Sequence, residues 1–167
     1  MKNRIGAGLV AGALGGVASG AVLRVAPMMT ADGARGPAMR MVADAVHTTK
    51  LPLAGAAYLV YAVLIGVLFG WMLAEQRMRA TAGVVWGLLY GVFWWLASLA
   101  IVMPVLRGLA PLTPAAVDAA RRGSAWWLVA MLLDGAVLGG VYALIAERRP
   151  PSGMTGEVVA GRRPHAA

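Results

Sequence analysis

Long apolar runs alternate with short polar segments along this chain. Each run is about as long as the roughly 20 residues that a helix needs to cross the hydrocarbon of a bilayer. The runs lack the polar alternation of membrane β-strands, and a lone helix pairs every backbone group within its own segment in lipid. The pattern therefore predicts four membrane-spanning helices, at about 5–28, 53–74, 81–106 and 125–146.

The polar segment between the first two spans has a helical pattern of its own. In "PAMRMVADAVHTTK", residues 37–50, Arg40, Asp44 and His47 fall on one face and apolar residues fill the others. This predicts an amphipathic helix that lies at the membrane interface with its charges in water. The alternative is a lid that holds the same three residues over a site between the spans.

Glycine recurs at four-residue spacing in every span. In water each glycine would cost a helix interior roughly 1 kcal/mol relative to alanine, but in lipid helices associate by close packing, which small residues permit. We therefore expect glycine faces to form the helix contacts, with the first and third spans at the centre of the bundle. The alternative is an oligomer interface, or a gap that admits a ligand or water. The glycines of these faces are Gly8, Gly12, Gly16, Gly20, Gly66, Gly70, Gly83, Gly87, Gly91, Gly135 and Gly139.

The two halves of the chain resemble each other. "GLVAGALGG" from Gly8 matches "GVVWGLLYG" from Gly83, and "IGVLFGWMLAEQR" from Ile65 matches "DGAVLGGVYALIAERR" from Asp134 once three residues are inserted. Each half holds two spans, so the repeat axis would lie along the membrane normal. The predicted fold class is an all-α integral membrane four-helix bundle. This bundle would then consist of two tandem two-helix repeats. The alternative is that glycine-spaced apolar helices resemble each other by composition alone.

Asp134 stands in the middle of the fourth apolar run, about 15 Å from either end at 1.5 Å per residue. A charged Asp at this depth costs roughly 2.5–3.5 kcal/mol on insertion scales, so such a residue is usually neutral, paired or facing a cavity. Arg24, about a turn inside the first span, is its natural partner. The two form a candidate intramembrane polar site, either as a structural tie or with Asp134 handling a proton or cation.

Composition agrees with a membrane protein and narrows the chemistry. The chain is 60% hydrophobic and 13% charged, about half the charge of a typical soluble domain. Cysteine is absent, and His47 and His165 lie outside the apolar runs. No catalytic or phosphate-binding motif is recognisable. We therefore expect no cofactor and no metal site.

The net charge of +8 arises at the ends of the apolar runs, which is typical of membrane margins and not of a nucleic-acid surface. Of the 15 Lys and Arg, eight lie on the side of the N-terminus and seven on the other. The turn "EQRMR" and the tail "ERRPP" then favour cytoplasmic termini in an inner-membrane protein. Residues 1–146 are expected to form one transmembrane domain and 147–167 a basic, disordered tail. Thr113 and Pro114 predict a short surface helix before the last span.

Three features follow one another in the second half: the span "GVVWGLLYG", then Pro104 followed by "GLAP", then a last span that ends in "ERR". On these residues the chain resembles the YagU-like family of small bacterial inner-membrane proteins. The resemblance implies a four-helix membrane topology and no established reaction. The proline-to-glycine spacing is one residue shorter here, and Asp134 stands near the place where the last span of that family tends to carry a histidine.

Three functions are compatible with the sequence. The expected one is a non-enzymatic structural or accessory protein that packs through its glycine faces with itself or with a partner subunit in the bilayer. The second is a small channel or proton-linked transporter that uses Asp134. The third is a membrane enzyme acting on lipid or isoprenoid, whose site would need Arg40, Asp44 and His47.

Overall fold

The computed structural model describes residues 2–29, 35–73, 79–114 and 124–147. The surface helix expected after Pro114 and the basic tail lie almost entirely outside these residues. Within the described residues four helices are long and apolar enough to cross a membrane, which confirms the four predicted spans. The elements are α1 (Lys2–Val25), β1 (Pro27–Met29), β2 (Arg35–Pro37), α2 (Arg40–Ala45), α3 (Leu51–Met72), α4 (Ala80–Ala97), η1 (Ser98–Val102), α5 (Met103–Leu106) and α7 (Ser124–Glu147).

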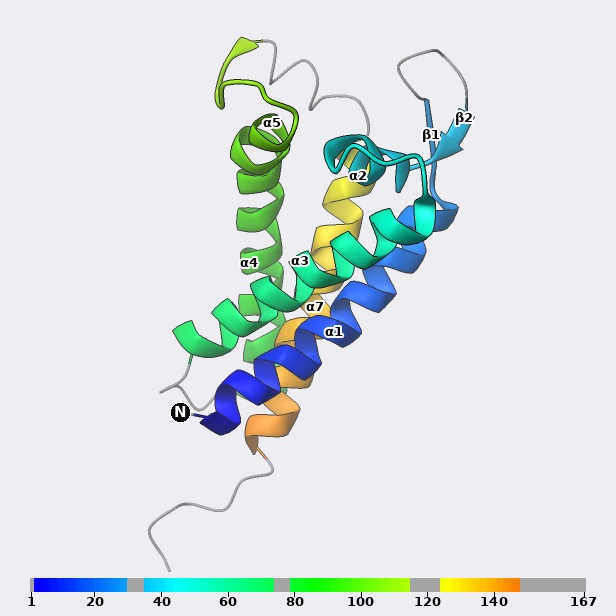
Figure 1. The fold of residues 1–167 in the computed structure, drawn as a ribbon. Coiled ribbons are helices and arrows are strands. Elements are labelled where there is room, and N and C mark those ends of the chain that lie inside the picture. Colours follow the sequence, from blue (N-terminus) through cyan, green and yellow to red (C-terminus); the bar gives the residue numbers. More distant parts are fainter. Residues whose placement is uncertain (1, 30–34, 74–78, 115–123, 148–167) are drawn as a thin grey trace, which may run out of the picture.

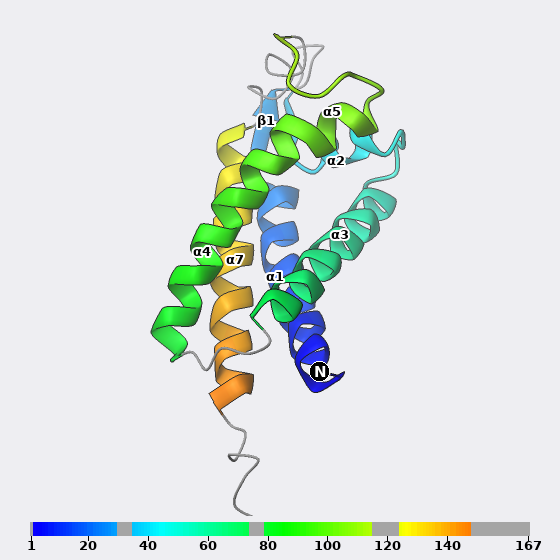
Figure 2. The same ribbon diagram turned by 90° about the vertical axis from the view of Figure 1, so that its left-hand side faces the viewer.

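The spans lie in the order α4, α7, α1, α3 across the molecule (Figure 2). The first and fourth spans are therefore central, and the expectation that the third span would be central is wrong. Of the most apolar stretch of the third span, 22% is buried, against 44% for the fourth span. The start of α1 and the end of α7 lie at one end of the bundle, and α2, α5 and the paired strands β1 and β2 lie at the other (Figure 1).

Glycine brings the backbones of α1 and α3 into contact. A Cβ atom on Gly12 would lie 2.8 Å from the carbonyl oxygen of Ala62 and 2.9 Å from the Cα of Gly66. No side chain larger than hydrogen fits there unless the helices separate. The same face also contains Gly8, Gly16, Gly20 and Gly70.

Helices α4 and α7 meet in the same way. A Cβ atom on Gly139 would lie 3.0 Å from the Cα of Gly87, and one on Gly135 would lie 3.2 Å from the Cα of Gly91. Gly83 completes this face, against Gly139. In a bilayer, contacts this close replace the hydrophobic effect as the force that holds helices together.

The segment after α1 differs from the predicted amphipathic helix over 37–50. Residues 35–37 pair as an antiparallel strand with 27–29, and α2 covers only Arg40–Ala45. The cause lies at the C-terminal end of α1, where carbonyl groups have no helical partner. Met39 donates its backbone N–H to the carbonyl of Leu23 at 2.8 Å, and Ala38 donates to that of Ala26 at 2.9 Å. These bonds fix α2 across the end of the bundle.

The third span contains a π-helical segment, η1, just before Pro104. Proline has no N–H and its ring crowds the carbonyl four residues earlier, which here belongs to Ala100. That carbonyl instead accepts the backbone N–H of Leu112 at 3.2 Å. The helix therefore continues through Pro104 to Leu106, and the chain turns at Gly108, where φ is +70°.

Aromatic side chains bridge the two outer helices, α3 and α4. The rings of Tyr61 and Trp94 meet edge to face at 6.0 Å, and those of Phe69 and Tyr90 lie 5.0 Å apart. The hydroxyl of Tyr90 donates to the carbonyl oxygen of Ile65 at 3.0 Å. Bulky aromatic contacts thus replace glycine contacts between these two helices.

Candidate functional site

Asp134 faces α1 from the middle of α7. Its side chain is 3% exposed, and it is the only acidic residue in the four spans. Gly15 makes room for it, because a Cβ atom on Gly15 would lie 2.5 Å from Oδ1 and 2.9 Å from the backbone oxygen of Asp134. The four-residue spacing of the neighbouring glycines does not include Gly15, so the pattern gives this glycine no role.

The carboxyl of Asp134 is not paired with Arg24. Arg24 is exposed at the last turn of α1, nine residues beyond Gly15 and thus about 14 Å along the helix axis. The Oδ1 atom of Asp134 is buried and has no hydrogen-bond partner among the described residues. The expected structural tie is therefore absent between these two residues, and the acid stands unpaired at this oxygen.

A chain of hydroxyl groups leads from α3 to the glycine beside Asp134. Tyr58 donates to Ser19 Oγ at 2.8 Å, and Ser19 donates to the carbonyl oxygen of Gly15 at 2.7 Å. Tyr58 and Ser19 are both buried. The chain crosses from α3 to α1 one helical turn away from Asp134.

A second hydroxyl pair lies between α3 and η1. Tyr61 Oη and Ser98 Oγ are 2.6 Å apart. Ser98 donates its hydrogen to the carbonyl of Trp94, so Tyr61 is the donor within the pair. A serine that bonds to the carbonyl four residues earlier bends a helix, and Ser98 stands where the α-helical part of this span gives way to the π-helical one.

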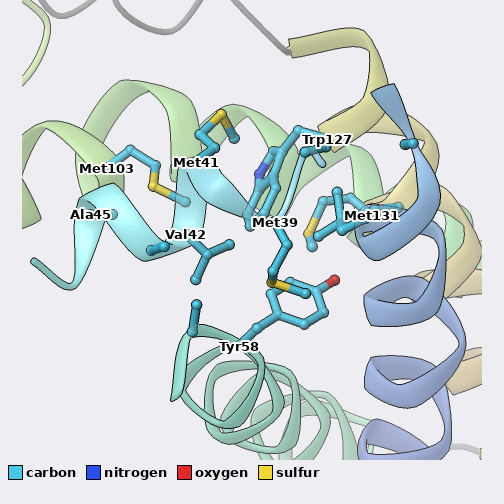
Figure 3. Packing of buried hydrophobic residues seen from close by; sticks show 14 residues of the cluster. Met39, Met41, Val42, Ala45, Tyr58, Met103, Trp127 and Met131 are labelled. Carbon is cyan, nitrogen blue, oxygen red and sulfur yellow. The ribbon is translucent and has the colours of Figure 1, made fainter. Parts of the chain in front are cut away.

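A pocket of about 60 Å³ lies beside these hydroxyls at the α2 end of the bundle. Its walls come from α2, α3, η1, α5 and α7, and they are almost entirely apolar. Trp127, whose side chain is 1% exposed, also lines the pocket. Trp127 stands among Met39, Met41 and Met131, and its ring meets that of Tyr58 edge to face at 5.6 Å (Figure 3).

The polar face expected around α2 does not take part in this pocket. Arg40, Asp44 and His47 are all exposed, and His47 lies beyond the helix with φ at +53°. The guanidinium of Arg40 folds back against Gly36 in the hairpin. The residues that α2 and its C-terminal end present to the pocket are instead apolar: Val42, Ala45 and Val46.

Several residues of this region were not singled out from the sequence. They are hydroxyl-bearing residues inside the spans: Ser19, Tyr58, Tyr61 and Ser98. The pattern places Trp127 in an interfacial belt at the start of the fourth span, but its side chain is buried. One signal was available, since a hydroxyl at membrane depth needs a hydrogen-bond partner. The sequence does not say which partner, because Ser19 and Tyr58 are 39 residues apart.

No group of three or more His, Cys, Asp or Glu that could hold a metal ion occurs within the described residues. The polar groups that this region places inside the bundle are instead the carboxyl of Asp134, the hydroxyls of the buried serines and tyrosines, and the indole of Trp127. Comparisons with protein-family models, with curated proteins and with solved structures gave no match for this chain.

Proposed function

We propose that the protein is a small proton-linked membrane transporter in which Asp134 takes up and releases the proton. The observation that carries this proposal is the buried Oδ1 of Asp134, which has no hydrogen-bond partner among the described residues. An ionisable residue inside the membrane is by default a functional candidate, because it costs stability that a leucine would not cost.

The unpaired state of Asp134 favours this function over a purely structural one. A structural acid at mid-membrane needs a partner that offsets the loss of hydration, and Arg24 is exposed at the end of α1. Without a cationic partner the carboxyl needs a proton or a bound cation. Exchange of that proton requires a polar path. The hydroxyls of Ser19 and Tyr58 end on the carbonyl of Gly15, one helical turn from the acid, so water is needed to connect them to the carboxyl.

The proposed arrangement is a tandem repeat of two glycine-packed helix pairs, α1–α3 and α4–α7. Its support is that the matched glycines of the two halves occupy matched contacts: Gly12 meets Gly66, and Gly87 meets Gly135. We place the protein in the inner membrane with both termini cytoplasmic, from the basic residues of the termini and of the turn after α3. The YagU-like resemblance is compatible with this topology.

The test is proton flux in proteoliposomes that contain the full-length protein and a trapped pH-sensitive dye. An imposed pH gradient should collapse faster with the native chain than with Asp134→Asn, which keeps the shape of the side chain and removes the exchangeable carboxyl proton. The matched control is Asp44→Asn, because Asp44 is exposed on α2. Equal flux from native protein and Asp134→Asn, with both correctly folded, would refute the proposal.

A second candidate is an accessory subunit, favoured by the outer position of α4. The accessory role assumed that the glycine faces would bind a partner subunit, but most of these glycines already contact helices of this chain. A partner would instead meet the apolar side of α4, where Val85, Trp86, Leu89 and Phe93 are exposed. Native mass spectrometry of gently extracted protein tests this, since a fixed complex with another protein supports the accessory role and its absence refutes it.

A further inference from the structure

We propose that the pocket beneath α2 binds a lipid-soluble molecule that carries a carbonyl oxygen, and that the indole N–H of Trp127 donates a hydrogen bond to that oxygen. The inference goes beyond proton exchange at Asp134 and does not depend on it. Trp127 lies seven residues before Asp134, which is about 10 Å along α7.

The walls of the pocket select an apolar body. They consist mainly of aliphatic side chains and Met103, together with the rings of Tyr58 and Tyr61. Ala57 and Tyr61 of α3 line it, together with Val102 and Leu106 of the third span. Since these residues belong to membrane spans, a molecule that enters between the spans comes from the bilayer.

The hydrogen-bond donors of the pocket select an acceptor oxygen. The hydroxyl hydrogens of Tyr58 and Tyr61 are already donated, to Ser19 and Ser98 respectively, and that of Ser98 goes to Trp94. Trp127 Nε1 is buried and meets no acceptor among the described residues. An indole nitrogen is a donor only, so the polar atom that satisfies it must be an acceptor.

The position of the indole directs this donor towards the pocket. In Figure 3 the nitrogen of Trp127 lies on the edge of the ring turned towards Met41 and, beyond it, Met103, and Met103 lines the pocket. The edge-to-face contact with Tyr58 holds the ring in this orientation. A buried tryptophan usually finds a partner for its N–H, and a ligand carbonyl supplies the partner that the chain does not.

The size of the pocket and the methionines packed around Trp127 indicate how the molecule is held. A volume of about 60 Å³ accepts the carbonyl end of a molecule and leaves the remainder between the spans. Met39, Met41, Met103 and Met131 surround Trp127 in one cluster. Methionine side chains are flexible and adapt to irregular shapes, so this cluster can widen around a ligand without breaking hydrogen bonds.

The test follows the indole N–H resonance of Trp127 by NMR in the full-length protein, in nanodiscs of ether-linked lipids that lack ester carbonyls. Octanone is titrated as the probe, and octane serves as the matched hydrocarbon without an acceptor. Octanone should shift the Trp127 resonance downfield in a saturable manner, and octane should not. In Trp127→Phe, which lacks this indole, octanone binding is followed by the methyl resonances of Val42 and Val102, which line the pocket, and it should be about 2- to 10-fold weaker, as expected for one hydrogen bond.

Two further variants keep the test independent of folding defects. Trp126→Phe removes the neighbouring indole, which does not line the pocket, and should leave octanone binding unchanged. Ala57→Leu adds bulk at the pocket wall and should abolish the shift while the indole of Trp127 remains. If the resonance is already shifted in ester-linked lipids without octanone, a membrane lipid supplies the carbonyl and the assignment stands.

Two results would overturn the proposal. One is a Trp127 resonance that does not respond to octanone, or that responds equally to octane. The other is a cross-peak between the indole N–H and a long-lived water molecule before any probe is added, since water would then satisfy the donor. Loss of proton flux in Asp134→Asn bears on neither result, so the two proposals fail separately.

Discussion

Replacement of Gly87 by alanine tests whether backbone contact between glycine faces holds the outer helix in place. The added Cβ atom would lie 2.9 Å from the carbonyl carbon of Gly135 and 3.0 Å from the Cα of Gly139. Both atoms belong to the backbone of α7, so no side chain can move aside. Helices α4 and α7 must separate instead.

The magnitude follows from two opposing contributions. Alanine gains about 1 kcal/mol over glycine as a helix former. Separation by a fraction of an ångström removes a quarter to a half of the dispersion energy along the contact, and overpacking of this kind costs typically 1–3 kcal/mol. Gly55 of α3 has nothing within 4 Å of its added Cβ atom, so Gly55→Ala measures the propensity contribution alone. The two variants should therefore differ by about 1–3 kcal/mol.

The assay is reversible unfolding in mild detergent, followed by circular dichroism. Gly87→Ala should unfold at a lower denaturant concentration than Gly55→Ala, with unchanged slope, and Gly55→Ala should match or exceed the native chain. Equal stability of the two alanine variants would mean that the glycine contact contributes nothing. The close packing of α4 on α7 would then not be what holds the bundle together.

Three further predictions concern single features of the structure. Tyr58→Phe removes the hydrogen bond to Ser19 Oγ and should lower the free energy of unfolding by about 0.5–1.5 kcal/mol; an unchanged unfolding midpoint would contradict the bond. Leu112 is 72% exposed and has φ at +62°, so Leu112→Gly should raise the free energy of unfolding by up to about 1 kcal/mol, since glycine adopts this conformation without strain. A triple change of Arg40, Asp44 and His47 to alanine should leave octanone binding intact in the NMR titration, because all three are exposed and none lines the pocket. Loss of binding would instead support the interpretation of these residues as a polar lid.

The spans and the glycine spacing were predictable because both depend on short-range sequence. A run of about 20 apolar residues has one stable conformation in lipid, and residues four apart lie on one helix face wherever the helix goes. Which glycine faces pair with each other depends on contacts between distant segments, which short-range sequence does not specify. The third span packs on the fourth and lies at the edge, because the interior beside α1 is filled by α7 and by Asp134.

The site could be predicted only in part, because it depends on register between distant segments. Asp134 was apparent as an acid in an apolar run, but its neighbour Gly15 and the exposure of Arg24 depend on how α1 and α7 align. The short α2 was missed for a similar reason. Its start is fixed by bonds from Ala38 and Met39 to the end of α1, which local periodicity does not reveal.

The most direct measurement of the central claim is infrared difference spectroscopy of the protein in nanodiscs, taken between acidic and alkaline conditions. A carboxylic-acid carbonyl band that appears and disappears with pH in the native chain, persists in Asp44→Asn and is absent from Asp134→Asn is the predicted result. It would show that the buried acid exchanges its proton in the folded protein. If the difference spectra of native protein and Asp134→Asn are identical, Asp134 does not exchange a proton and the transport proposal fails.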